Sequence, residues 1–108
     1  MQTLESERQK LVKIKSMMVE KMLLTLQSLL IGVPAHYDIC DFTSLDYMNI
    51  NGSWCLTLKR PSMPRTNVFD LSIKEMAAVY INLDGFLEHY LQEAAKQRLE
   101  IEEILYGQ

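Results

Sequence analysis

The last third of the chain carries one continuous apolar stripe at helical spacing. Its hydrophobic residues recur at three- and four-residue steps, which places them on one face of an α-helix; they are Met76, Val79, Tyr80, Leu83, Phe86, Leu87, Tyr90, Leu91, Ala94, Ile101, Ile104 and Leu105. Ser72 and Glu75 match a capping box, in which the serine hydroxyl accepts a hydrogen bond from the first turn. The stripe therefore predicts one helix over 73–106, about 50 Å long at about 1.5 Å per residue.

The dipeptide Asp84-Gly85 lies inside this predicted helix and looks like a turn. The apolar stripe nevertheless passes through it without losing phase, and both residues fall on the polar face of the helical pattern. A mid-helix glycine costs only about 1 kcal/mol, which is small against the burial of the stripe. We therefore expect the helix to be continuous.

A second apolar stripe occupies the first third of the chain. It consists of Leu11, Ile14, Met18, Met22, Leu26 and Leu29. Thr3 or Ser6 can cap its start, while Gly32 and Pro34 supply a stop signal. These features predict a helix over 4–31, about 40 Å long.

The middle of the chain predicts a β-hairpin. Asn51-Gly52 is the dipeptide that tolerates positive φ at both centres of a type I′ turn, and alternating apolar residues follow it. We expect the hairpin over 47–59, preceded by a loop over 32–46 that shows no sustained period. A basic loop over 59–71 follows, since its prolines cannot donate to a central ladder.

These elements define an α+β fold in a single domain, residues 1–108, with the order helix–hairpin–helix. A compact domain of this length has a radius of gyration of about 13 Å, and rods of about 40–50 Å are too long for it. Two helices and a two-stranded ribbon also do not enclose a core. We therefore expect a homodimer or a higher even oligomer, with the helices in a four-helix arrangement. A monomer with bent or broken helices is the alternative.

The charge distribution singles out one connection. The net charge is −3, which gives no general case for nucleic acid or an anionic membrane. Lys59, Arg60 and Arg65 nevertheless stand together between acidic neighbours, with Thr66 beside them. Cations and hydroxyls near a helix start are the materials of an anion site. No Walker pattern is present, so the loop predicts contact with an acidic protein surface or, alternatively, a plain solvated connection.

A nucleotide or similar anionic ligand held between subunits is the second hypothesis for this loop. Its phosphate would pair with the loop cations, and the aromatic ring of Trp54 or Tyr37 would stack on the base. The tracks of cations that duplex-binding faces carry are longer than this one, so nucleic acid is disfavoured.

The segment "HYDICD" contains several groups that ligate metals: His36, Asp38, Cys40 and Asp41. A zinc site normally has four ligands in recognisable pairs, which this segment lacks. A Cys40 nucleophile with His36 as base lacks an orienting group. We therefore expect a structural loop with a buried Cys40, and neither a metal nor a cofactor.

Two further absences shape the functional hypothesis. No secretory signal begins the sequence, and the most apolar run, 22–33, is shorter than the roughly twenty residues that span a bilayer. The sequence contains no convergent acid–base groups. We therefore expect a cytoplasmic, non-enzymatic interaction protein of the inhibitor or adaptor type, which presents its hairpin and basic loop to an acidic partner.

Overall fold

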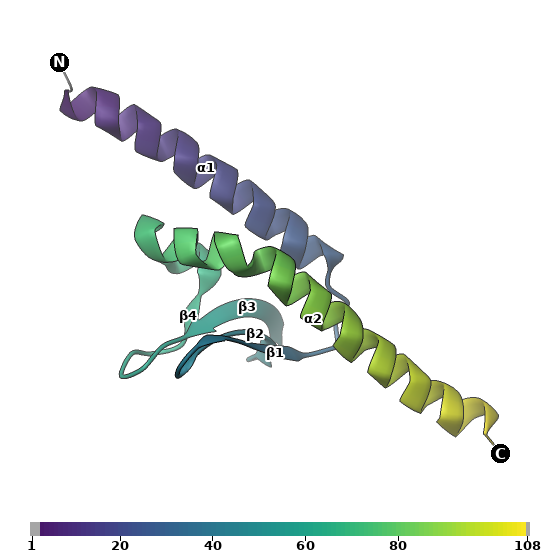
Figure 1. Ribbon diagram of the computed structural model, residues 1–108. Helices are drawn as coiled ribbons and strands as arrows, with labels where there is room; N and C mark the ends of the chain where they lie inside the picture. Colours follow the sequence, from purple (N-terminus) through teal and green to yellow (C-terminus); the bar gives the residue numbers. More distant parts are fainter. Residues whose placement is uncertain (1–2, 108) are drawn as a thin grey trace.

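A computed structural model describes residues 3–107 (Figure 1). The fold is α+β: two helices pack on one face of a four-stranded antiparallel sheet with strand order β1-β2-β3-β4. The elements are α1 (Leu4–Ser28), β1 (Ala35–Cys40), β2 (Thr43–Ile50), β3 (Ser53–Lys59), β4 (Thr66–Asn67), a 3-10 turn (Val68–Asp70) and α2 (Ile73–Tyr106).

Both helices begin where their caps predict. The Thr3 side chain accepts a hydrogen bond from the Ser6 amide at 3.0 Å, and Ser72 accepts one from the Glu75 amide at 3.3 Å. The bounds of α2 agree with the predicted 73–106, whereas α1 ends at Ser28 rather than at 31. Leu29 already has extended backbone angles, so the chain leaves the helix before the glycine.

The predicted hairpin is confirmed and turns out to be part of a larger sheet. Asn51 and Gly52 have φ values of 52° and 90°, as a type I′ turn requires, and β2 pairs with β3 around them. The predicted loop over 32–46 is wrong, because it contains β1 and the start of β2. The predicted basic loop likewise contains β4.

The core lies between the inner face of the sheet and the two helices. Its buried side chains include Met18 and Met22 from α1, Leu45, Tyr47, Leu56 and Leu58 from the sheet, and Met76, Val79, Leu83, Phe86 and Tyr90 from α2. Phe86 is fully buried, and the Tyr37 ring meets it edge-on with centroids 6.3 Å apart. Four strands thus close a core that a two-stranded ribbon does not close.

The helices run side by side and in the same direction, but with a large offset (Figure 1). Lys21 pairs with Asp84 at 3.2 Å, and the Leu30 amide donates to the Tyr90 hydroxyl at 2.8 Å. The start of α1 and the end of α2 therefore project from opposite ends of the molecule, which measures 72 × 29 × 26 Å. Its radius of gyration of 17.0 Å exceeds the value of about 13 Å for a compact domain.

Helix α2 is continuous through Asp84-Gly85, as predicted. The assignment of Gly85 to the polar face is wrong, because Gly85 faces the sheet. A Cβ atom on Gly85 would overlap the Tyr37 hydroxyl and come within 3.2 Å of Tyr37 Cζ. The glycine thus lets the helix approach β1 closely. Across residues 3–107, neither helix holds a run that is long and apolar enough to cross a lipid bilayer.

Candidate functional site

The face of the sheet that the helices leave uncovered carries a set of hydrogen-bonded polar side chains. We call it the open-face cluster; its members are His36, Ser44, Asp46, Thr57 and Arg65. The strand register brings them together, because His36 on β1 and Thr57 on β3 both stand opposite Asp46 on β2. Side chains at directly opposed positions share one face of a sheet.

Asp46 is the centre of the open-face cluster, and its side chain is only 10% exposed. The Ser44 hydroxyl donates to one carboxylate oxygen at 2.7 Å, and Arg65 Nη1 lies 3.0 Å from the same oxygen. His36 Nδ1 donates to the other oxygen. Burial by itself raises the pKa of Asp46, but the hydrogen bonds from Ser44, His36 and Arg65 outweigh it and hold the pKa below its ordinary value.

His36 has a carboxylate at each ring nitrogen. Its Nδ1 faces Asp46, and its Nε2 lies 2.9 Å from the Asp38 carboxylate. The hydrogen bond to Asp46 is the main cause of a pKa raised above 6.5, against a smaller opposing effect of burial. Carboxylate oxygens accept hydrogen bonds and do not donate them, so two carboxylates at the two ring nitrogens favour the doubly protonated ring. The Ser44 hydroxyl also points to Asp46, so the carboxylate of Asp46 accepts from both of its neighbours on the open face.

Arg60, a residue of the predicted anion site, points toward the first turn of α2. Its guanidinium bonds the Glu75 carboxylate and, at 2.6 Å, the Thr66 hydroxyl, and its side chain is 12% exposed. The hydrogen bond from Arg60 is the main reason that the pKa of Glu75 lies below its ordinary value. Arg60 and Thr66 therefore serve to hold the loop on α2.

The three loop cations do not converge on one point. Arg60 is paired with Glu75, and Arg65 is paired with Asp46. Among residues 3–107, Lys59 is the member of the trio for which no ion pair forms, and it is exposed. The chain's own carboxylates thus neutralise two of the three charges that the sequence assigns to an anion.

The two aromatic residues proposed to stack on a base lie on the helix-facing side of the sheet. Tyr37 packs against Phe86 and against the His89 ring, whose centroid is 5.6 Å away. Trp54 is half-buried against Tyr47, with centroids 5.2 Å apart. Neither ring therefore shares a surface with Lys59.

The metal and thiol hypotheses for "HYDICD" find no geometric support. No three His, Cys, Asp or Glu side chains within residues 3–107 are placed to hold a metal ion. Cys40 is exposed rather than buried, because it ends an edge strand where the ladder shifts register between Asp38 and Cys40. Asp41 lies in the turn that follows.

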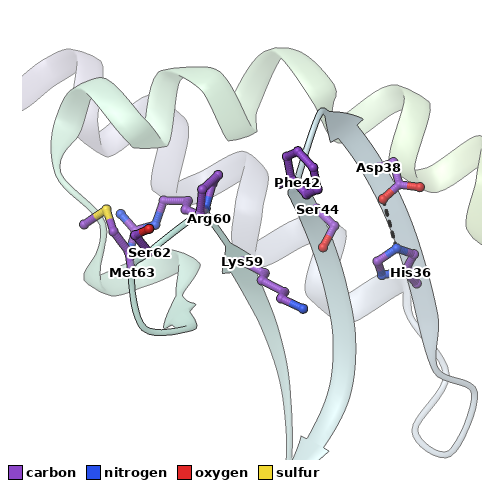
Figure 2. A pocket seen from close by; sticks show the side chains of 9 residues that line it. His36, Asp38, Phe42, Ser44, Lys59, Arg60, Ser62 and Met63 are labelled. Carbon is purple, nitrogen blue, oxygen red and sulfur yellow. Dashed lines mark hydrogen bonds and ion pairs between the residues drawn. The ribbon is translucent and has the colours of Figure 1, made fainter.

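Figure 2 shows a groove between two turns at one end of the open face. We call it the turn groove; its volume is about 570 Å³, and it is lined by His36, Asp38, Phe42, Ser44, Lys59, Arg60, Pro61, Ser62 and Met63. Phe42 lies at the tip of the β1–β2 turn and is 86% exposed, and Met63 lies in the basic loop and is 52% exposed. Lys59 lies between them (Figure 2).

Both turns beside the groove contain a non-glycine residue with left-handed backbone angles. Phe42 has φ of 60° and Ser62 has φ of 55°. Positive φ at the second central residue of a turn normally goes to glycine or asparagine, and a bulky side chain there costs about 1–2 kcal/mol. Sequence reasoning missed Phe42 and Met63, although each is a large apolar residue among turn-forming polar or proline residues.

Comparison with known proteins adds no assignment to this geometry, because no protein-family model, curated protein or solved structure matches the chain.

Proposed function

We propose that the protein is a non-enzymatic interaction protein, of the inhibitor or adaptor type, that binds an acidic and partly apolar segment of a partner protein in the turn groove. The observation that carries this proposal is Phe42, a phenylalanine held almost fully in solvent at positive φ beside Lys59.

Phe42 is unfavourable for the fold in two respects. The residue is 86% exposed, so it adds little to the core, and its positive φ favours glycine or asparagine. Strain of this kind gathers at sites where the side chain is needed for binding. Met63 on the far side of the groove adds a flexible apolar surface that adapts to a partner's side chains.

Lys59 supplies the charge preference of the turn groove. It is exposed between the two apolar tips, and within residues 3–107 it forms no ion pair. The neighbouring Asp38 carboxylate already faces His36 Nε2 at 2.9 Å. A partner carboxylate therefore meets an available ammonium, while apolar side chains on either side of it contact Phe42 and Met63.

The paired arginines give the groove a firm base. Arg60 ties the basic loop to Glu75 on α2, and Arg65 ties it to Asp46 on β2. A loop held at both ends loses less conformational freedom when a partner binds. The alternative of an anionic small ligand such as a nucleotide has less support, since these arginines are engaged and Tyr37 and Trp54 face the helices.

We further propose that the protein works as a homo-oligomer in the cytoplasm. Large apolar side chains remain exposed on both helices, including Leu11, Ile14, Ile101 and Leu105. Both cysteines, Cys40 and Cys55, are free thiols, which suits a reducing compartment.

Selection from a random-peptide display library tests the groove. Peptides selected on the wild-type protein should be enriched in acidic residues flanked by aromatic or aliphatic ones. Phe42→Asn and Lys59→Glu should each weaken a selected peptide by at least about tenfold, which corresponds to about 1.4 kcal/mol.

Folding and specificity controls separate binding from stability. Phe42→Asn should unfold at the same temperature as the wild type or higher, because asparagine tolerates positive φ. Ile81→Gln removes an exposed apolar side chain elsewhere on α2 and should leave binding unchanged. Equal affinity of the selected peptides for the wild type and both groove variants would refute the proposal.

A further inference from the structure

Each helix has a projecting part that continues its buried stripe beyond the body of the molecule. We call residues 4–17 the α1 overhang and residues 91–106 the α2 overhang. In α1, Met18 is 2% exposed, but Ile14 and Leu11 on the same face are 45% and 46% exposed. In α2, Tyr90 is 6% exposed, whereas Ile101, further along the same apolar stripe, is 47% exposed. In both helices the apolar stripe thus extends beyond the part of the protein that buries it.

The offset between the parallel helices leaves space beside each overhang. The α2 overhang continues beyond the end of α1 and has no neighbouring helix there (Figure 1). In the same way, the α1 overhang lies beyond the start of α2 (Figure 1). A groove of about 350 Å³ lies along the α2 overhang next to the end of α1; Val33, Ala94, Ile101 and Leu105 are among its lining residues. The groove therefore leaves room for another helix beside the α2 overhang.

The two overhangs are complementary in charge and similar in length. The α1 overhang carries four basic and two acidic residues, a net +2, and the α2 overhang carries two basic and four acidic residues, a net −2. At about 1.5 Å per residue the overhangs are about 21 Å and 24 Å long. Complementary net charge favours the pairing of unlike ends over like ends.

We infer that the α1 overhang of one copy of this chain packs against the α2 overhang of a second copy. This inference rests on the self-association in the proposed function and is independent of the turn groove. Pairing two α1 overhangs or two α2 overhangs would bring like net charges together, whereas the unlike pair covers both apolar stripes. In a closed dimer both overhangs of each copy are used, so that each copy contributes the apolar faces of two helical segments to the contact.

Two matched double variants test the pairing. Leu11→Gln/Ile14→Gln removes the apolar stripe of the α1 overhang, and Ile101→Gln/Leu105→Gln removes that of the α2 overhang. Glutamine is a good helix former, so the overhangs stay helical, and all four positions are exposed in the monomer. Sedimentation velocity measures the association of each variant, and far-UV circular dichroism checks the fold.

Neither variant should self-associate as the wild type does, and the apparent dissociation constant of each should rise at least about tenfold. An equimolar mixture should form a one-to-one complex, because one copy retains its α1 overhang and the other its α2 overhang. Ile81→Gln, which removes an exposed apolar residue outside both overhangs, should associate like the wild type. Self-association of either double variant at wild-type strength, or a mixture that stays monomeric, would overturn the inference.

Charge reversal provides a second, independent test. Lys13→Glu/Lys15→Glu changes the α1 overhang from +2 to −2, and Glu100→Lys/Glu103→Lys changes the α2 overhang from −2 to +2. Either double reversal alone should abolish association at low salt, since like charges then meet. The quadruple variant should recover it. Failure of the quadruple variant to recover, with its helices intact, would contradict unlike pairing.

The outcomes also separate this inference from the proposed function. A wild-type protein that is monomeric at high concentration would overturn both the inference and the proposed homo-oligomer. An oligomer that survives the overhang substitutions would overturn the inference alone. Peptide binding in the turn groove is unaffected in either case, because no groove residue is changed.

Discussion

The two halves of α2 have the same sequence period and different surroundings. In the first half, 73–90, the apolar stripe is buried against the sheet and α1, and Met76, Val79, Leu83 and Phe86 have no exposed surface. In the second half, 91–106, Ile101, Ile104 and Leu105 are 47–68% exposed. The comparison shows that helical periodicity predicts which face of a helix is apolar, but not which molecule covers that face.

The largest expected contrast is between truncations in the two halves. Phe86→Ala should lower the free energy of unfolding by about 3–5 kcal/mol, because it leaves a cavity in the packed core. Ile101→Ala should change it by less than about 0.5 kcal/mol in the monomer, since the side chain is already half in solvent.

Urea unfolding followed by circular dichroism measures both variants, at a protein concentration where the wild type is monomeric. A cost for Ile101→Ala similar to that for Phe86→Ala would mean that the second half of α2 is packed against the body of its own chain. A cost that appears only at high protein concentration would instead sharpen the contrast, because the missing cover would then come from association.

A smaller effect is expected at Gly85. This residue lies in the packed half of α2, where the helix backbone comes close to Tyr37 on β1. Alanine gains about 1 kcal/mol in helix propensity, but its Cβ overlaps the Tyr37 hydroxyl. Overpacking of this kind costs about 1–3 kcal/mol. Gly85→Ala should therefore destabilise the protein by roughly 1 kcal/mol.

The matched background for Gly85→Ala is Tyr37→Phe, which removes the hydroxyl oxygen and retains the ring. In this background the alanine should become neutral or stabilising in thermal unfolding. If the penalty were the same in both backgrounds, the close approach to Tyr37 would not be its cause.

The smallest effect is a pH dependence that belongs to the packed body and not to the overhangs. Because Asp46 and Asp38 raise the pKa of His36 above 6.5, the stabilisation is fully present below pH 6.5 and is lost as pH rises through the folded-state pKa. The lowered pKa of Asp46 acts in the opposite range: its stabilisation is present above pH 3.8 and is lost as pH falls through the folded-state pKa. The pair therefore contributes most between these two values.

Unfolding free energies measured from about pH 6 to about pH 9 should fall slightly for the wild type, through loss of the imidazolium. His36→Gln should flatten this decline, since glutamine does not titrate. The same slope in both proteins would show that another group causes it. The interactions of the exposed carboxylates in the α2 overhang should instead weaken as the salt concentration rises.

Local signals in the sequence were sufficient for much of the fold. The capping box at Ser72 and the stripe through Phe86 predicted α2 to the residue, and Asn51-Gly52 predicted the central turn. Strand β1 was missed although its residues alternate, with Ala35, Tyr37 and Ile39 toward the core and His36 and Asp38 on the open face. The run is only six residues long, and its pairing with β2 is not encoded in a local pattern. A two-residue strand such as β4 has no period of its own.

The candidate site was less predictable than the fold. Lys59, Arg60 and Arg65 lie close together in the sequence, at the end of β3 and in the loop that follows it, yet their side chains go to different places. Arg60 pairs with Glu75, 15 positions later in the chain, and Arg65 pairs with Asp46. Such pairings depend on strand register and on the docking of α2, neither of which a local pattern encodes.

By itself the sequence determined the helix faces, the helix starts and the central turn, because hydrogen bonds and steric limits within a few residues decide them. The tertiary structure decided that four strands close the core and that Phe42 and Lys59 share a groove. It also decided that the apolar stripes of α1 and α2 continue into the two exposed overhangs. Those outcomes depend on which distant surfaces meet. Burial and ion pairing are contacts between segments far apart in the chain, so only the packed fold specifies them.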